Sequence, residues 1–120
     1  MKNILIIGCG LLGSSLLIKI KKKKIAKKIY IYEKSKVNIS KIKKLKLPGT
    51  IVNKLQDAVI KSDLIILCTP MSEYKNLILK MNKFLSPKTI ITDIGSSKLE
   101  SLKIIKKFLR KDIFWTSSHP

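Results

Sequence analysis

The sequence has 120 residues, 45% of them hydrophobic, which predicts a single domain over residues 1–120 with a buried core and excludes a disordered segment. Its net charge of +19 suggests nucleic acid as a partner, but 25 of the 26 basic residues are lysine, which lacks the bidentate fork that arginine presents to guanine. Because the lysines are spread over the whole chain, we expect no specific nucleic-acid partner.

A glycine-rich turn at residues 8–13 separates the first two expected elements. Lys2–Ile7 is a nearly continuous apolar run, typical of a strand buried on both faces of a parallel sheet. The helix after the turn has an apolar stripe at Leu12, Leu16 and Ile20, and ends in the lysine run 21–24, where cations complement the helix dipole. A second strand at 28–32 follows and ends at Glu33, completing the ~30 residues of a strand-helix-strand unit.

The same N-terminal stretch has an alternative interpretation as a secretory signal peptide. Residues 4–18 are mostly apolar and follow Lys2, but they include three glycines and two serines, lack a small-x-small cleavage site and run into lysines. The stretch is also too short to cross a bilayer comfortably. We therefore expect a cytoplasmic protein with no membrane contact.

Strands and helices alternate over the rest of the chain. The further expected strands are residues 51–54, 64–68, 88–92 and 112–116. The further expected helices are 35–45, with a cap at Ser35 and apolar positions Val37, Ile42 and Leu45, and the short helix Leu55–Lys61. Two more are expected: 72–85 with Tyr74, Leu77, Ile78, Met81 and Leu85 on one face, and a last helix that opens with a capping box at 97–100 and buries Leu102, Ile105 and Leu109. This alternation predicts an α/β fold of the Rossmann type: a doubly wound, mostly parallel sheet with helices on both faces.

Ligands of such sheets bind at the carboxyl ends of the strands. Polar or glycine-bearing residues follow five of the expected strands, at residues 8–13, 33, 69–70, 93–96 and 117–119. Because the strands are expected to be parallel, these residues should meet at one edge of the sheet. That convergence favours a binding site there.

The spacing Gly-x-Gly-x-x-Gly between a strand and a helix predicts a dinucleotide site. Its residues Gly8, Gly10, Leu11, Leu12 and Gly13 are expected to bring backbone N–H groups close to a pyrophosphate.

Glu33 lies 20 residues after Gly13, where a carboxylate can accept hydrogen bonds from ribose hydroxyls and repel a 2′-phosphate. This favours NAD over NADP as the cofactor. Two alternatives remain open: Glu33 is an ordinary acid before a helix, or Lys34 and Lys36 attract the phosphate of NADP.

The other strand ends carry candidate catalytic and binding residues. His119, the only histidine, is a candidate general base near neutral pH, and Ser96 is a candidate for orienting a substrate hydroxyl. Thr69-Pro70 is expected to shape the floor under the nicotinamide, and Asp93 either makes a second polar contact or caps the loop around Gly95. Each also has an ordinary interpretation, as a surface histidine, a turn serine, a strand terminator or a loop cap.

The two cysteines, Cys9 and Cys68, lie far apart in apolar surroundings. We expect free, buried thiols in a reducing compartment, behaving as small hydrophobes rather than as nucleophiles or a disulfide. The sequence offers no cluster with metal-ligand spacing, so no metal is expected.

Four segments together resemble the prephenate/arogenate dehydrogenases of tyrosine biosynthesis: 8–16 (GCGLLGSSL), 66–70 (ILCTP), 92–98 (TDIGSSK) and 118–120 (SHP). The most specific parts are Thr-Asp-x-Gly-Ser and Ser-His-Pro at their mutual spacing. The 3-hydroxyacid dehydrogenases and pyrroline-carboxylate reductases share the glycine loop but not this pair. Ser97 and Ser117 depart from the family pattern, which often has an apolar residue and a glycine there.

The resemblance implies an enzyme with NAD lying across the glycine loop and its ribose at Glu33. It implies that His119 takes the proton from the ring hydroxyl while hydride leaves that carbon for the nicotinamide, and that Ser96 hydrogen-bonds the same hydroxyl. Loss of CO2 then yields 4-hydroxyphenylpyruvate.

The family continues with a helical domain that forms the homodimer and holds the substrate carboxylates, and this domain is absent from residues 1–120. We therefore expect the cofactor-binding portion of an oxidoreductase that by itself binds prephenate poorly. The alternatives are a non-catalytic nucleotide-binding fragment and an arogenate dehydrogenase, because the groups that distinguish the two substrates would lie beyond Pro120.

Overall fold

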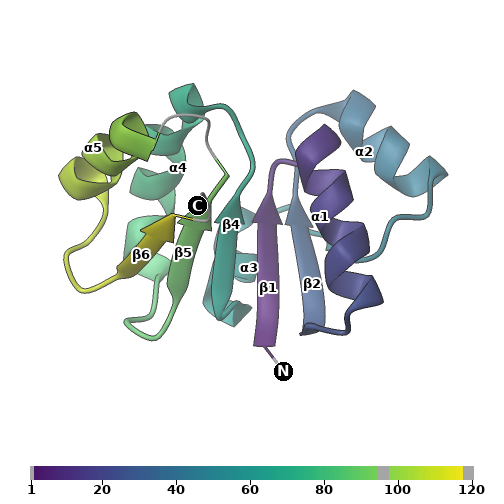
Figure 1. Cartoon of the computed structure of the whole chain (residues 1–120), viewed down its shortest axis with the longest axis horizontal. Coiled ribbons are helices and arrows are strands. Elements are labelled where there is room, and N and C mark those ends of the chain that lie inside the picture. Colours follow the sequence, from purple (N-terminus) through teal and green to yellow (C-terminus); the bar gives the residue numbers. More distant parts are fainter. Residues whose placement is uncertain (1, 95–97, 118–120) are drawn as a thin grey trace.

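The sheet of this protein is parallel throughout and reverses its strand order in the middle (Figure 1). The computed structural model describes residues 2–94 and 98–117, and in that part six strands form one sheet in the order β3-β2-β1-β4-β5-β6. The strands are β1 (Lys2–Ile7), β2 (Ala26–Tyr32), β3 (Thr50–Ile51), β4 (Leu64–Leu67), β5 (Ile90–Asp93) and β6 (Phe114–Ser117). The reversal between β1 and β4 is the switch point of a doubly wound sheet, which confirms the predicted fold class.

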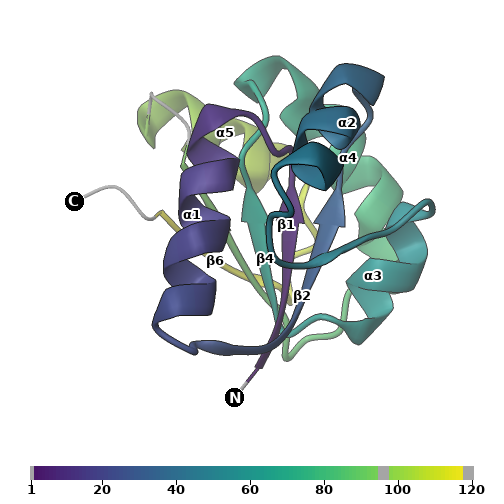
Figure 2. The same cartoon turned by 90° about the vertical axis from the view of Figure 1, so that its right-hand side faces the viewer.

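Helices cover both faces of the sheet. They are α1 (Leu11–Lys22), α2 (Lys36–Lys44), α3 (Leu55–Lys61), α4 (Tyr74–Met81) and α5 (Lys98–Phe108), with single 3-10 turns η1 (Met71–Glu73) and η2 (Asn82–Phe84) on either side of α4. Residues of α1 and α2 pack on one face, and residues of α3, α4 and α5 on the other. Figure 2 shows α1 and α3 on opposite sides of the sheet. Right-handed crossovers produce this division, because the face changes when the strand order changes direction.

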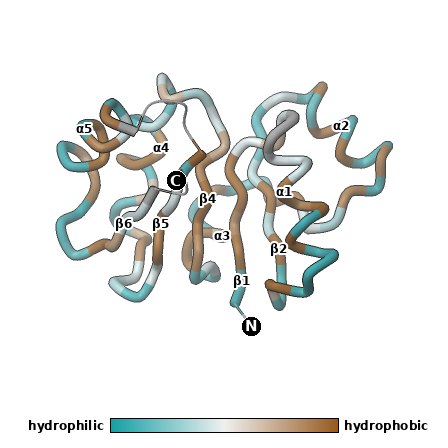
Figure 3. Tube along the Cα trace, in the orientation of Figure 1, coloured by the Kyte–Doolittle hydropathy of each residue, from teal (hydrophilic) through white to brown (hydrophobic). Residues whose placement is uncertain are grey.

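The hydrophobic core has two layers, one on each face of the sheet. In β1, Ile4 and Ile6 face the α1 layer, whereas Leu5 and Ile7 face the α4 layer, and all four are buried. The apolar character of β1 and β4 along most of their length is visible in Figure 3. A strand buried on both faces needs such a continuous apolar run, as the sequence predicted.

Two helices face the core differently from the sequence prediction. In α1 Ile20 is buried as predicted, but Leu17 is buried as well, while Leu16 is only half-buried. Gly13 packs against the loop after β1, and Leu17 lies one turn further on the same side. In α2 only Ile42 is buried, and the predicted apolar positions Val37 and Leu45 are 64% and 66% exposed. The predicted inward face of α4 is confirmed in full.

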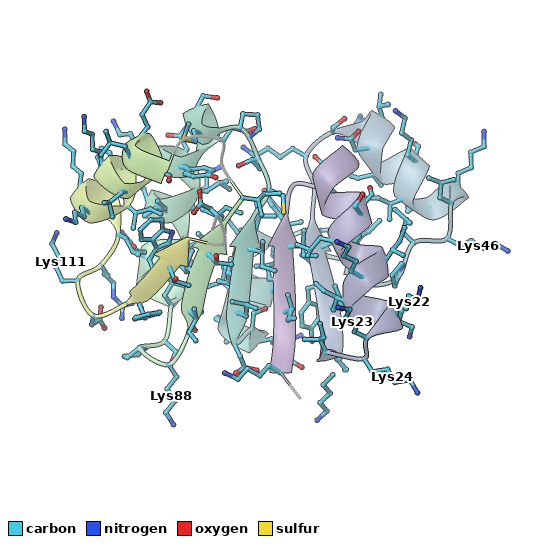
Figure 4. All side chains as sticks on the ribbon, viewed as in Figure 1. Lys22, Lys23, Lys24, Lys46, Lys88 and Lys111 are labelled. Atoms are coloured by element: carbon cyan, nitrogen blue, oxygen red, sulfur yellow. The ribbon has the colours of Figure 1, made fainter. Side chains whose placement is uncertain are left out.

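The lysines lie on separate elements around the molecule. Lys22, Lys23 and Lys24 extend from the end of α1, and Lys46, Lys88 and Lys111 extend outward from three other parts of the chain (Figure 4). This distribution agrees with the prediction that the positive charge is not gathered on one element. No helix within residues 2–94 and 98–117 has the length and apolar character needed to cross a membrane.

Candidate functional site

A cavity of about 420 Å3 opens at the carboxyl ends of β1, β2 and β4, where the strand order reverses. Five of the residues predicted to bind a cofactor line it: Gly8, Gly10, Glu33, Thr69 and Pro70. The structure therefore brings together residues that are more than 60 positions apart in the sequence. Ligands of open α/β sheets bind at this switch point.

The three glycines of the loop have different physical reasons to be glycine. Gly8 has φ of +88°, and a Cβ there would lie 2.7 Å from Thr69 Cγ2. A Cβ on Gly13 would lie 2.6 Å from the carbonyl oxygen of Gly8, so only glycine lets α1 approach the end of β1 this closely. A Cβ on Gly10 would meet no described atom within 4 Å beyond its chain neighbours, and Gly10 lines the cavity. Two glycines thus shape the turn, and the third keeps its cavity side open.

The N-terminus of α1 points its backbone donors toward this loop. Gly10 is the N-cap, and Leu11, Leu12 and Gly13 form the first turn, which has neither a side-chain cap nor an acidic residue. The first N–H groups of a helix have no partner within the helix and carry its positive dipole end. This first turn can therefore bind an anionic group such as a phosphate.

Glu33 ties the glycine loop to the end of β2 and the start of α2. Its Oε1 accepts hydrogen bonds from the Cys9 N–H at 2.6 Å and from Asn38 Nδ2 at 3.2 Å, and its Oε2 accepts from the Ser35 N–H at 3.0 Å. An acid that merely precedes a helix would bond only to that helix. Glu33 instead spans two segments that wall the cavity.

Asn38 is a lining residue that the sequence analysis missed, while the cap at Ser35 is confirmed. Asn38 is the third residue of α2, and its N–H donates to Ser35 Oγ at 3.3 Å. The available signal was its position: an amide three residues after a capping serine can point back to the preceding strand end. That signal is weak, since asparagine is common in first turns.

The segment after β4 forms the wall opposite Glu33. The Thr69 hydroxyl oxygen is buried and has no hydrogen-bond partner in the described part of the chain. Buried polar groups in folded proteins are nearly always satisfied, so an unsatisfied hydroxyl beside a cavity fits a polar ligand. Pro70 also lines the cavity and is exposed.

Both cysteines are free, as predicted, but only Cys9 is fully buried and Cys68 is half-buried in the cavity wall. Burial raises the pKa of Cys68 to about 12 and also raises the pKa of Cys9, because the thiolate loses its hydration. Both groups are therefore neutral thiols at physiological pH. No group of three or more histidine, cysteine and acidic residues that could hold a metal ion occurs in the described ranges.

The remaining predicted residues lie at the β5 and β6 ends. Asp93 is completely buried and accepts a hydrogen bond from the Tyr74 hydroxyl at 3.0 Å, and it does not line the cavity. Gly95, Ser96 and His119 lie outside the described residues. Asp93 and Ser117 are register partners on neighbouring parallel strands, so β5 and β6 end side by side at the cavity edge of the sheet.

Comparisons with known proteins agree with the resemblance found in the sequence. The sequence model of the family "prephenate dehydrogenase, nucleotide-binding domain" matches residues 17–120. Cyclohexadienyl dehydrogenase from Zymomonas mobilis is 33% identical over 119 residues, which are 99% of this chain and 40% of that protein.

Solved structures give the same result. Prephenate dehydrogenase from Aquifex aeolicus, solved in complex with hydroxyphenyl propionate and NAD+, superposes with a TM-score of 0.80 at 26% identity, over 94% of this chain and 40% of that chain. Arogenate dehydrogenase from Synechocystis has the same fold, with a TM-score of 0.75 at 23% identity over 88% of this chain and 37% of its own. The chain thus spans about 40% of the length of the curated relative it matches.

Proposed function

The chain belongs to the family of prephenate dehydrogenase nucleotide-binding domains, and we propose that it binds NAD in the cavity after β1, β2 and β4. There it would serve the oxidative decarboxylation of prephenate to 4-hydroxyphenylpyruvate in tyrosine biosynthesis. The observation that carries this proposal is the division among the glycines: Gly8 and Gly13 admit no Cβ, while Gly10 leaves its cavity side open. A backbone shaped in this way suits the close approach of a pyrophosphate.

Each part of the dinucleotide has a matching group in the cavity. The first-turn N–H groups of Leu11, Leu12 and Gly13 would hold the pyrophosphate, and Glu33 would accept a hydrogen bond from the adenosine ribose. The unsatisfied Thr69 hydroxyl and Pro70 would lie toward the nicotinamide. The Glu33 carboxylate opposes a 2′-phosphate, which favours NAD over NADP.

The proton step would fall to residues that follow β5 and β6. NAD, when bound, supplies the acceptor for the hydride that leaves the substrate ring. His119 would accept the proton of the ring hydroxyl, since a neutral imidazole is an effective base near pH 7. Ser96 would donate a hydrogen bond to the same hydroxyl oxygen and hold it in line. The side-by-side ends of β5 and β6 support this pairing of the two segments.

The substrate and the assembly are part of the same proposal. We assign prephenate as the substrate and a helical region, corresponding to the part of the relatives that this chain does not span, as the holder of its carboxylates and as the homodimer contact. We place the enzyme in the cytoplasm, where its proposed product, 4-hydroxyphenylpyruvate, would be used for amino-acid synthesis. Arogenate is the competing substrate, and the assay below includes it.

The test measures NADH formation with prephenate and with arogenate, for this chain alone and with the remaining part of the Zymomonas mobilis relative added as a separate chain. We expect NADH from prephenate in the completed enzyme. His119→Asn should lower kcat by about 100-fold or more, as removal of a general base does, while leaving the Kd for NAD unchanged.

Three results would contradict parts of the proposal. Turnover retained by His119→Asn removes His119 from its role. NAD binding with no turnover in either form supports a non-catalytic nucleotide-binding domain. No binding of NAD at all overturns the cofactor site itself.

A further inference from the structure

Asn38 is held at two points beside the Glu33 carboxylate. Its backbone N–H donates to Ser35 Oγ at 3.3 Å, and its side-chain Nδ2 donates to Glu33 Oε1 at 3.2 Å. Ser35 in turn donates its backbone N–H to Glu33 Oε2 at 3.0 Å. Because the first turn of α2 fixes the backbone of Asn38, its amide reaches the carboxylate from a defined direction.

The hydrogen bonds divide unequally between the two carboxylate oxygens of Glu33. Oε1 accepts from both Cys9 and Asn38, whereas Oε2, within residues 2–94 and 98–117, accepts from Ser35 alone. A carboxylate oxygen can accept from more than one donor, so Oε2 keeps an acceptor position. Glu33, Ser35 and Asn38 all line the cavity, and a ligand hydroxyl there can donate to that position.

We propose that Asn38 is a positioning residue that orients the Glu33 carboxylate and thereby sets the preference of this site for NAD over NADP. The inference rests on the proposed NAD site. Asn38 satisfies Oε1 on the loop side, which leaves Oε2 available for the adenosine ribose. Without the amide, only the backbone N–H groups of Cys9 and Ser35 hold the carboxylate, so its orientation toward the ribose is less strictly fixed and its repulsion of a 2′-phosphate weakens.

A cation in the same cavity makes this orientation important. Lys34 lines the cavity next to Glu33 in the sequence and attracts the extra phosphate of NADP. The site therefore contains one group that opposes NADP and one that favours it. Asn38 acts on the first group only, so its removal should change the ratio of the two affinities rather than scale both equally.

The test is a set of titrations of the whole 120-residue chain with NAD and NADP, for wild type, Asn38→Ala, Glu33→Ala and the double variant. We expect Asn38→Ala to lower the ratio of NAD to NADP affinity by about fivefold and Glu33→Ala to lower it by about tenfold or more. The double variant should match Glu33→Ala alone, because Asn38 acts through that carboxylate.

The control is Ser40→Ala, a change on the exposed side of the same helix, which should leave both affinities unchanged. Asn38→Ser is the second variant: it is tolerated in a first turn but too short to reach Glu33, and it should behave like Asn38→Ala. Thermal melts establish that each variant is folded.

The outcomes separate the two proposals. If wild type binds neither dinucleotide, the proposed function fails. If wild type binds NAD but Asn38→Ala leaves the ratio unchanged, lowers both affinities equally, or adds its full effect to that of Glu33→Ala, the positioning role of Asn38 is wrong while the NAD site stands.

Discussion

Two charged side chains, Glu33 after β2 and Arg110 before β6, each join segments that are distant in sequence. Arg110 is the only arginine of the chain. Its Nη1 donates to the carbonyl oxygens of Asn82 and Leu85, and its Nε and Nη2 donate to the two oxygens of Asp112 at 2.9 and 2.7 Å. The side-chain hydrogen bonds between Arg110 and Asp112 lower the pKa of Asp112 and raise the pKa of Arg110. Arg110 thus connects the turn after α4 to the segment after α5.

The hydrogen-bond networks of Glu33 and of Arg110 differ in their relation to the cavity. Arg110 directs both arms of its guanidinium to atoms of its own chain and does not line the cavity, so it stabilises the fold. Glu33 keeps an acceptor position on Oε2 and lines the cavity. A charged group with remaining hydrogen-bonding capacity toward a cavity is a candidate binding residue, while a charged group whose hydrogen bonds tie segments together away from the cavity is a structural one.

The largest expected effect concerns the glycine loop that Glu33 contacts, where a Cβ would clash at Gly13 but not at Gly10. Gly13→Ala would place a Cβ 2.6 Å from the Gly8 carbonyl oxygen, which is backbone and cannot turn aside. We expect it to lower the free energy of unfolding by about 2 kcal/mol, as overpacking does, and to abolish NAD binding because α1 must shift. Urea denaturation and NAD titration measure the two effects.

Gly10→Ala is the matched control, since its Cβ meets no described atom within 4 Å beyond its chain neighbours. We expect its stability to change by less than about 1 kcal/mol, while NAD affinity falls about tenfold because the methyl group stands where the pyrophosphate approaches. An unchanged NAD affinity in Gly10→Ala would show that the open side of Gly10 is not a binding feature, and destabilisation equal to that of Gly13→Ala would show that this side is not open.

The same loop shows how far the sequence could predict this molecule. Strand positions, the glycine turn and Glu33 follow from local patterns, because β1 and β4 are buried on both faces and the dinucleotide spacing is set by one strand-helix-strand unit. In α1 the burial of Ile20 was predicted, but the burial of Leu17 in place of Leu16 was not, because it depends on the contact of Gly13 with the Gly8 carbonyl. Asn38 was missed for the same reason: its role depends on where α2 starts relative to the glycine loop. The roles of Ser96 and His119 stay predictions.

The second-largest expected effect concerns Arg110, the side chain that stabilises the fold. Arg110→Met removes the side-chain hydrogen bonds to the carbonyl oxygens of Asn82 and Leu85 and to Asp112, but it keeps the apolar stem and the backbone N–H bond to Asn82 Oδ1. We expect a Tm lower by a few degrees with an unchanged Kd for NAD. Arg110→Lys should recover only part of the loss, because an ammonium group lacks the planar fork. Lys88→Met, which removes the same charge at an exposed site, is the control and should change neither value. A weaker Kd for NAD in Arg110→Met would mean that the two networks are coupled.

The smallest effect concerns Cys68, the thiol in the wall of the Glu33 cavity. Burial raises the pKa of Cys68 to about 12 from an ordinary value of 9.0, so at neutral pH the thiolate fraction is roughly a thousandfold lower than that of a free thiol. A thiolate of higher pKa is also more nucleophilic, which offsets about half of the difference in thiolate fraction on a logarithmic scale. Alkylation of Cys68 by iodoacetamide should therefore be at least about tenfold slower than alkylation of glutathione. The alkylation rate should continue to rise with pH above 9.0, where the rate of an ordinary thiol levels off, because the neutral form of Cys68 persists until about 12.

Mass spectrometry of the Cys9→Ala variant measures the labelling of Cys68 alone, and NAD should slow this labelling further because Cys68 lines the cavity. A rate that levels off near pH 9.0, or one that NAD leaves unchanged, would place Cys68 in open solvent rather than in the wall of the site that Glu33 serves.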